Sequence, residues 1–245
     1  MYKRLAGKNI LITGASTGFG RSIALTCAVE GANLALIARS EDKLQEVAEL
    51  AATEGVNVTF YVADVGIPEQ VIAAVEKAQA KLGFINVLVN NAGTNVAERS
   101  IQDTSLEQWQ LLMDVNVTSA FQFTKLLLPA MIEHKEGTII NISSRAAVTP
   151  SLLAGVAYST SKIGMDALND VTNEEGNPHN VRACIICPGV GSTPILDRRP
   201  APPSPEKRSR MLQPEDIADT VVMVASLHQR ANMKRIEINP TFVVE

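Results

Sequence analysis

The sequence has few residues of the kinds that form disulfides and metal sites, with three cysteines and three histidines among 245 residues. Cys184 and Cys187 have a spacing found in redox and metal motifs, but they lie in an apolar stretch, 181–187, that predicts a strand. Residues three apart in a strand point to opposite faces about 10 Å apart, whereas the Cα atoms of a disulfide lie within about 7 Å. The histidines lack metal-ligand spacing and are expected at surface helix ends: His134, His179 and His228. We therefore predict neither a disulfide nor a metal site.

Long apolar runs and an excess of positive charge are also absent. No apolar run approaches the roughly 20 residues that a transmembrane helix requires, and a predicted strand follows Met1–Arg4 too closely for a signal peptide. The net charge of −4 and the pI near 5.5 argue against nucleic acid and anionic membrane as main partners. The sequence therefore predicts a cytoplasmic protein.

What the sequence does contain is a regular alternation of predicted strands and helices. The strands are expected at 8–13, 33–38, 57–62, 85–90, 137–143, 181–187 and 235–239. The helices are expected at 18–30, 41–54, 68–82, 104–134, 156–175 and 214–228. We predict an α/β fold: a single Rossmann-type domain, 1–245, with a doubly wound parallel sheet of about seven strands and helices on both faces. The strand order should begin 3-2-1-4-5-6, with the site at the carboxyl ends of the strands.

A glycine-rich turn joins the first predicted strand to the first helix. The segment from Gly14 to Gly20 differs from the commoner G-x-G-x-x-G spacing, but the order of strand, turn and helix is the same. Glycines let the backbone approach a pyrophosphate, and the helix N-terminus presents free N–H groups to it. The second strand ends at Arg39 without an acidic residue, which favours the 2′-phosphate of NADP over the 2′-hydroxyl of NAD. A surface arginine that merely ends the strand is the alternative.

Tyr158 and Lys162 lie four residues apart in a predicted helix, which places them on one face about 5–6 Å apart at Cβ. An ammonium beside a phenol favours the phenolate. A free tyrosine, with a pKa of about 10, exchanges protons inefficiently at neutral pH. The pair therefore predicts a proton donor and acceptor, although a surface helix can carry the same spacing by chance.

From Leu5 to Thr193 the chain resembles a short-chain dehydrogenase/reductase, because seven marks of that family occur in order and at similar intervals. The marks are Thr13–Gly20, Asp64-Val65, Asn90–Gly93, Asn116, Ser143-Ser144, Tyr158 with Lys162, and Pro188-Gly189 with Thr193. The resemblance implies a Rossmann fold, an NAD(P) cofactor and a reaction on CH–OH groups.

The resemblance also implies a role for each position. Tyr158 would be the general acid in reduction and the base in oxidation, and Lys162 would lower its pKa and bind the nicotinamide ribose. Ser144 would bond the substrate oxygen, while Ser143 would bond backbone. Asn116 would hold a water that links Lys162 to solvent. Cofactor contacts would come from Gly14, Ser16, Thr17, Gly18, Phe19, Gly20, Arg39, Asp64, Val65, Asn91, Ala92, Gly93, Tyr158, Lys162, Pro188, Gly189, Gly191 and Thr193.

The chain departs from the family pattern in three places. Thr17 stands where a basic residue is frequent, which weakens the expectation of NADP. Gly191 stands where a branched apolar residue is usual, which predicts a looser loop. The end of the chain, 236–245, lacks the Gly-Gly segment of many relatives and is interpreted as variation within the family.

A proline-rich and arginine-rich segment follows the sixth predicted strand. Residues 191–213 are expected to form an irregular substrate lid, because long irregular loops in compact domains are usually functional or disordered. Arg198 or Arg199, with Arg145, is a candidate for binding an anionic substrate. A solvated basic loop is the alternative.

These features predict an NADP-dependent carbonyl reductase or alcohol dehydrogenase that acts on a small or medium ketone or secondary alcohol. The alternatives are an NAD-dependent alcohol dehydrogenase that works oxidatively and a non-catalytic dinucleotide-binding regulator. The predicted helices 104–134 and 156–175 carry apolar residues on more than one face, Leu111 and Phe121 among them. Because relatives in the family pair these two helices, we expect a homodimer or homotetramer.

Overall fold

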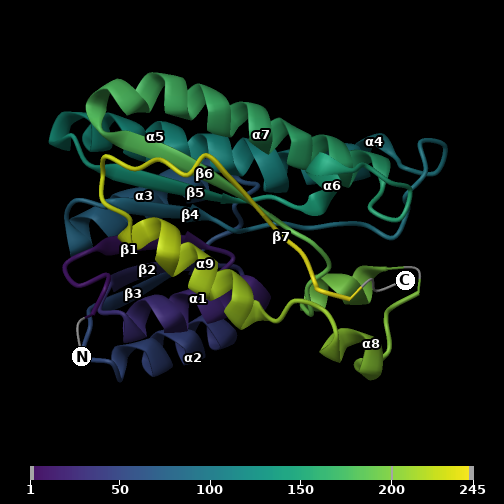
Figure 1. The fold of residues 1–245 in the computed structure, drawn as a ribbon, viewed down its shortest axis with the longest axis horizontal. Helices are drawn as coiled ribbons and strands as arrows, with labels where there is room; N and C mark the ends of the chain where they lie inside the picture. Colours follow the sequence, from purple (N-terminus) through teal and green to yellow (C-terminus); the bar gives the residue numbers. More distant parts are fainter. Residues whose placement is uncertain (1–2, 200, 243–245) are drawn as a thin grey trace.

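The computed structural model describes residues 3–199 and 201–242, and at its centre is one parallel sheet of seven strands (Figure 1). The spatial order is β3-β2-β1-β4-β5-β6-β7, which confirms the predicted order. The strands are β1 (Asn9–Thr13), β2 (Asn33–Ala38), β3 (Val58–Val62), β4 (Val87–Asn90), β5 (Gly137–Ile142), β6 (Val181–Pro188) and β7 (Arg235–Ile238). The central strands are apolar and buried almost throughout, because both faces of the sheet are covered.

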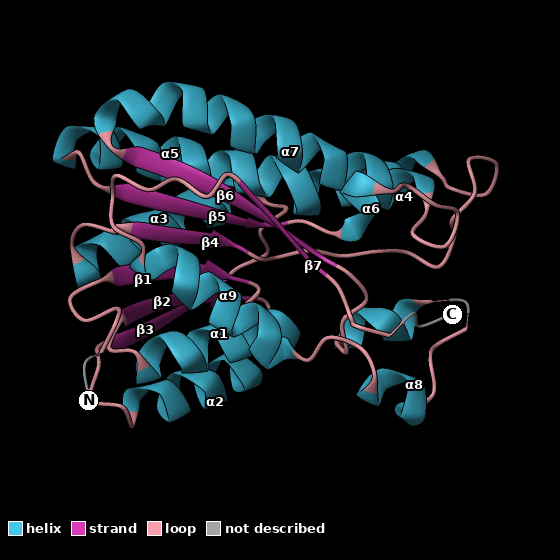
Figure 2. Ribbon diagram, in the orientation of Figure 1, coloured by secondary structure: helices cyan, strands magenta, loops and turns pink. Residues whose placement is uncertain are grey.

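Helices cover the two faces of the sheet, as Figure 2 shows. One face carries α1 (Gly18–Val29), α2 (Glu41–Ala52) and α9 (Pro214–Ser226), and the other carries α3 (Pro68–Leu82), α5 (Ser119–His134) and α7 (Val156–Gly176). Strand β1 shows the alternation that builds the two cores. Ile10 and Ile12 pack with α1, α2 and α9, whereas Leu11 packs with α3 and α5. The predicted α/β fold with helices on both faces is therefore confirmed.

The helix predicted at 104–134 is interrupted. It consists of α4 (Leu106–Met113), a π-helical turn η1 (Asp114–Thr118) and α5. Asn116 lies in the π turn, where its side chain bonds the backbone N–H and C=O of Thr94 and the hydroxyl of Ser161. Single π turns inside helices are rare and occur frequently at functional sites. Here the turn directs a buried amide toward the carboxyl edge of the sheet.

The lid segment is less irregular than expected. It contains two short helices, η3 (Pro194–Arg198) and α8 (Pro205–Ser209). Two further short helices that were not predicted lie outside the lid, α6 (Arg145–Val148) and η2 (Asn177–His179). Ser204 caps α8 by accepting from the N–H of Lys207, and Pro205 occupies the first helical position. Proline is favoured there because that N–H has no intrahelical acceptor. Pro194 and Pro205 therefore start the short helices η3 and α8 rather than prevent them.

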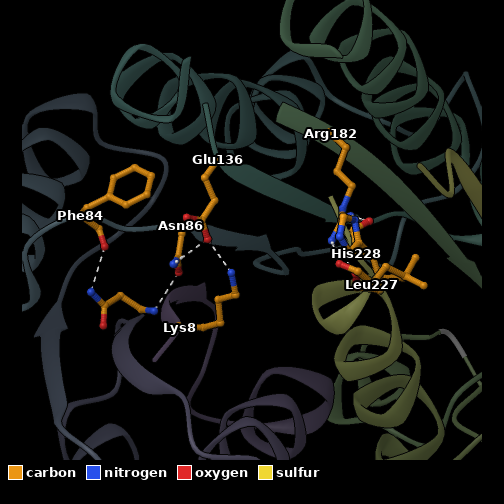
Figure 3. Close-up of polar contacts among 9 residues, drawn as sticks. Lys8, Phe84, Asn86, Glu136, Arg182, Leu227 and His228 are labelled. Carbon is orange, nitrogen blue, oxygen red and sulfur yellow. Dashed lines mark hydrogen bonds and ion pairs between the residues drawn. The ribbon is translucent and has the colours of Figure 1, made fainter. Parts of the chain in front are cut away.

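The amino edge of the sheet is held by polar contacts (Figure 3). Glu136, just before β5, pairs with Lys8 and accepts from the amide of Asn86. Arg182, at the start of β6, donates to the carbonyl oxygens of Leu227 and His228 and so satisfies the chain end of α9. This edge is occupied by structural contacts, which leaves the opposite edge for chemistry.

The cysteines and histidines occupy the environments expected of them. Cys184 packs in the core beside α1 and α9, and Cys187 packs beneath α7, so their side chains lie on opposite faces. Both are buried free thiols, as is Cys27. The histidines are exposed and lie at or just beyond helix ends. Within residues 3–199 and 201–242, no helix is long and apolar enough to cross a membrane, and no cluster of potential metal ligands occurs.

Candidate active site

Two cavities open at the carboxyl edge of the sheet. The smaller, of about 470 Å³, is lined by the glycine turn and by the residues that follow β2, β3 and β4. The larger, of about 770 Å³, is lined by the ends of β5 and β6, the loop before α7 and the lid. The two share part of their walls, at Phe19, Ser143, Tyr158, Thr193 and Ile195. Tyr158 therefore faces both spaces.

The glycine turn is built for close backbone packing. Gly14 and Gly18 have φ angles of +66° and +54°, and a Cβ on Gly20 would lie 2.2 Å from the carbonyl oxygen of Gly14. The side-chain amide of Asn91 donates to the carbonyl oxygens of Thr13 and Gly14, at 2.9 and 3.2 Å. Side chains larger than hydrogen are thus excluded at these glycines, and Asn91 holds the turn in place.

The start of α1 is suited to an anion. Thr17 caps the helix without a side-chain hydrogen bond, and the first turn contains no acidic residue. The first N–H groups of a helix lack intrahelical partners and lie at its positive end. Ser16, Thr17, Gly18 and Phe19 line the smaller cavity at this point. The residues present therefore fit the pyrophosphate of a dinucleotide.

The other end of the smaller cavity carries the expected Arg39 and a cation that the sequence analysis missed. Arg39, Ser40 and Lys43 line this end, and Arg39 lies 3.6 Å from a carboxylate oxygen of Asp64. The other oxygen of Asp64 accepts from the N–H of Gly66. Lys43 lies in the first turn of α2, four residues after Arg39 at the end of β2. Its closeness to the strand end could have identified it in the sequence as a second candidate for binding the cofactor.

The remaining predicted cofactor residues lie around the same space. Ala92, Gly93 and Val65 line the smaller cavity, and Pro188, Gly189 and Gly191 line the larger one. Thr193 lines both and packs on the glycine turn, since a Cβ on Gly18 would lie 3.2 Å from the Cβ of Thr193. The structure therefore brings the predicted cofactor positions to the two cavities at this edge, except Gly20, which lines neither and packs against the carbonyl oxygen of Gly14. The amide of Asn91 serves the turn rather than pointing free into the cavity.

The expectation of a looser loop at Gly191 is wrong. Gly191 forms a β-bridge with Leu212, and the carbonyl oxygen of Leu212 accepts from the N–H of Ser192 at 2.8 Å. A Cβ on Gly191 would lie 2.4 Å from the ring of Phe19. The ring therefore fills the space where a branched side chain would stand at position 191, and the loop is packed.

Lys162 is almost completely buried, with 3% of its surface exposed. Its ammonium donates to the carbonyl oxygen of Ile142 at 2.8 Å and lies 5.8 Å from the centre of the Tyr158 ring. Burial lowers the pKa of Lys162 to about 8. At neutral pH this group still carries a proton that it can release.

Ser144 and Ser143 have different partners. The hydroxyl of Ser144 accepts from the N–H of Ala146 at 3.1 Å, and its nearness to Tyr158 acts to lower the pKa of the phenol. Ser143 donates to the backbone carbonyl of Lys162 at 3.2 Å. Ser143 therefore bonds backbone as predicted, whereas the bond from Ser144 to a substrate oxygen stays a prediction.

The pKa of Tyr158 is raised above its usual value, because the desolvation of the phenol outweighs everything that lowers it. Ser144, Arg99 and Arg199 act in the lowering direction. The net direction is opposite to the one expected from the pair of Tyr158 and Lys162. The reason is that Lys162 directs its ammonium to the carbonyl of Ile142, while the protein atoms packed around the partly buried phenol disfavour its charged form.

Asn116 lies near Lys162 behind Gly93, and it does not itself line the smaller cavity. A Cβ on Gly93 would lie 3.5 Å from both the Oδ1 atom of Asn116 and the Nζ atom of Lys162. The two polar groups therefore converge on one point. The relay through a water that the resemblance implies for Asn116 stays a prediction.

The arginines of the lid divide between the two cavities. Arg198 lines the smaller cavity and bonds Thr94 and the carbonyl oxygen of Asn95. Arg199 and Arg145 line the larger cavity, together with Arg99, which the sequence analysis missed. No local pattern marked Arg99, since it reaches the cavity from the loop after β4.

Comparison with known proteins places these features in one family. The sequence pattern of the short chain dehydrogenase family matches residues 8–203. Oxidoreductase UcpA of Escherichia coli (strain K12) is 34% identical over 239 residues, which cover 91% of this chain and 89% of the relative. The uncharacterized oxidoreductase SAR2567 of Staphylococcus aureus (strain MRSA252) is 31% identical over 238 residues, 96% of this chain and 98% of the relative.

Solved structures extend the likeness to the fold. A metagenomic short-chain oxidoreductase in complex with NADP has a TM-score of 0.85 and 30% identity, and the match covers 98% of this chain and 100% of that one. The alcohol dehydrogenase of the archaeon Thermococcus sibiricus, complexed with 5-hydroxy-NADP, has a TM-score of 0.86 and 27% identity, with 96% and 97% covered.

Proposed function

The chain is a member of the short-chain dehydrogenase/reductase family, an NAD(P)-dependent oxidoreductase that acts on CH–OH groups, and we propose that it reduces a small or medium ketone with NADPH. The observation that carries this proposal is the position of Tyr158 on the wall common to both cavities, with Ser144 on the wall of the larger one. A cofactor in the smaller cavity and a carbonyl compound in the larger one would meet at its hydroxyl.

Residues of the smaller cavity would hold the cofactor, which when bound supplies the hydride. The first turn of α1 would take the pyrophosphate, and Lys162 the nicotinamide ribose. Arg39 and Lys43 would take the 2′-phosphate, since no acidic residue stands at the end of β2. The NADP and 5-hydroxy-NADP held by the two similar structures support this preference.

Tyr158 would give its proton to the substrate oxygen. A phenol is protonated at neutral pH even at the usual tyrosine pKa of about 10, and the raised pKa of Tyr158 keeps it so, as a proton donor in reduction requires. Ser144 would donate to the same oxygen and orient it. Lys162, with its pKa of about 8, would return a proton to the tyrosine, and Asn116 would hold a water that links Lys162 to solvent. NAD-dependent oxidation is the second candidate, and in that direction Tyr158 would act as the base.

The experiment is turnover of NADPH and of NADH against a panel of carbonyl compounds by the wild type and by Tyr158→Phe. The substitution removes the transferable proton and should lower kcat by about 10²–10⁴-fold, with NADPH affinity unchanged by fluorescence titration. Ser144→Ala should also lower kcat, whereas Ser143→Ala, the matched control, should not. More than a tenth of wild-type activity in Tyr158→Phe would show that this mechanism is wrong.

The same protein is proposed to form a homodimer or homotetramer through α4, α5 and α7. Leu111 and Phe121 are about half exposed on these helices, and so are Ile163 and Val171. Apolar side chains gathered on neighbouring helices favour burial against a second copy. Light scattering at micromolar concentration that shows only a 26.3 kDa species would contradict this proposal. Cytoplasmic location stays a prediction.

A further inference from the structure

The charge on the wall of the larger cavity has one sign. Four basic residues line the cavity, Arg99, Arg145, Arg199 and Lys207, and none of its described lining residues is Asp or Glu. Within residues 3–199 and 201–242, none of the three arginines of this wall forms an ion pair. Guanidinium groups that line a cavity without a carboxylate are unusual, because charged groups removed from water are normally paired.

Arg99 is the most buried of these cations, with 9% of its surface exposed. Its Nη1 donates to the carbonyl oxygen of Ala154 and its Nη2 to that of Arg198, at 3.1 and 3.2 Å, while its buried Nε has no partner. Arg99 therefore joins the loop before α7 to the lid. It places a fixed positive charge beside Tyr158, whose pKa it acts to lower.

Arg145 and Arg199 have donors to spare, because within the described part of the chain no hydrogen bond or ion pair involves either side chain. Arg145 is exposed, whereas Arg199 is half-buried on the lid and lines the same cavity as Tyr158. Burial lowers the pKa of Arg199, and Tyr158 acts in the opposite direction. Arg199 acts on Arg99 as a like charge. An anion between them would relieve both the repulsion and the missing hydrogen bonds.

The rest of the wall is largely apolar. Leu153, Leu196, Met211 and Phe242 contribute to it, from the loop before α7, from the lid and from the segment after β7. A ligand that matches this wall has an apolar body and one anionic end. A carboxylate is the simplest anionic end of this kind, because one planar carboxylate pairs with one guanidinium through two parallel hydrogen bonds.

We propose that the substrate is an oxo acid, whose carboxylate is bound by Arg199 in the field of Arg99 while its ketone oxygen meets Tyr158 and Ser144; this rests on the proposed reductase function. The carboxylate takes no part in the bond changes. The carbonyl carbon gains a hydride from NADPH, the oxygen gains the proton of Tyr158, and the products are the hydroxy acid and NADP⁺. Bidentate pairing with a guanidinium fixes the orientation of the carboxylate and hence of the carbonyl.

The experiment compares straight-chain oxo acids with their methyl esters, which keep the ketone and lose the charge. With wild type and NADPH, kcat/KM should favour the acid. Arg199→Met should raise KM for the acid by about 10- to 100-fold, the loss expected for a hydrogen-bonded ion pair, whereas KM for the ester should change little. Any effect of Arg199 on the pKa of Tyr158 should appear as an equal change in kcat for both compounds. Arg199→Lys should restore part of the loss. Arg210→Met is the control, since Arg210 pairs with Glu206 and does not line the cavity.

The outcomes separate this inference from the proposed function. Equal kcat/KM for the acid and the ester would overturn the oxo acid as substrate and leave the proposed reductase function intact. An equal effect of Arg199→Met on KM for both compounds would do the same, and it would mean that Arg199 acts only on Tyr158. Reduction of neither compound would count against the reductase as proposed. In that case the anion site is tested by calorimetry, which measures the affinity of the oxo acid for the protein with NADP⁺. Equal affinity for the wild type and Arg199→Met would overturn the anion site.

Discussion

Replacing Lys162 with methionine should destroy activity and yet stabilise the protein near neutral pH. The ammonium of Lys162 is buried, with 3% exposed, and its pKa is lowered from 10.5 to about 8. Each pKa unit corresponds to about 1.4 kcal/mol, so the charge costs the folded state about 3 kcal/mol at neutral pH. Methionine removes this cost but leaves the carbonyl of Ile142 without its donor, a loss of about 1–3 kcal/mol.

The pH dependence of this effect has a definite sign. Lys162 is neutral in the folded protein above a pH of about 8 and in the unfolded chain only above 10.5, so the unfolded chain binds more protons between these values. The wild type therefore gains stability as pH rises through this window, and the methionine variant does not. From about pH 7 to about pH 9.5 the advantage of the variant should fall by about 2 kcal/mol, enough to reverse it.

Differential scanning calorimetry at equal protein concentration measures this difference. A change of 2 kcal/mol corresponds to about 4–8 °C in Tm for a chain of this size. Lys77→Met, at an exposed lysine of α3, controls for the loss of a lysine elsewhere. A Tm difference between Lys162→Met and wild type that stays constant with pH would refute the reasoning, because the cost of burying the charge would then be absent.

Three further outcomes follow from contacts in the structure. Arg39→Asp should weaken NADPH much more than NADH, by about 1.5–3 kcal/mol for a lost charged hydrogen bond, and fluorescence titration with both cofactors checks this; equal wild-type affinities would remove its basis. Gly191→Val should lower Tm and NADPH affinity, because its Cβ would lie 2.4 Å from the ring of Phe19. Adding Phe19→Ile should recover much of both losses. Additive effects of the two substitutions in a double-mutant cycle would contradict this packing. Arg182→Met should destabilise the protein by about 3–5 kcal/mol in thermal unfolding, because four carbonyl oxygens within or just after α9 lose their hydrogen-bond donor. A variant with the Tm of the wild type would show that water donates to these carbonyls in place of the arginine.

Much of the fold and the site followed from local sequence. Buried strands such as β4 and β5 are short apolar runs, and the helices between them carry the period of a surface helix, so element order could be predicted without contacts. The glycine turn and the pair of Tyr158 and Lys162 are also local, because their spacing decides which groups share a turn or a helix face. Parallel strands then place these motifs at one edge of the sheet.

Other features could not be predicted because they depend on atoms that come from distant segments. The π turn at Asn116 is held by Thr94 and Ser161, and the space at Gly191 is filled by Phe19. Neither pairing leaves a local pattern. The lid helices were not predicted, because the cluster of prolines was interpreted as an irregular loop. Proline is also frequent at the first position of a helix.

The sequence by itself determined which groups can carry protons and phosphates and the order in which the sheet presents them, since these depend on residue type and on short-range periodicity. Only the tertiary structure decided how those groups behave. Burial raises the pKa of Tyr158 and lowers that of Lys162, and Arg99 reaches the cavity of Tyr158 from a loop far away in the chain. Desolvation and long-range charge depend on the density of surrounding atoms, and that density exists only once the chain is folded.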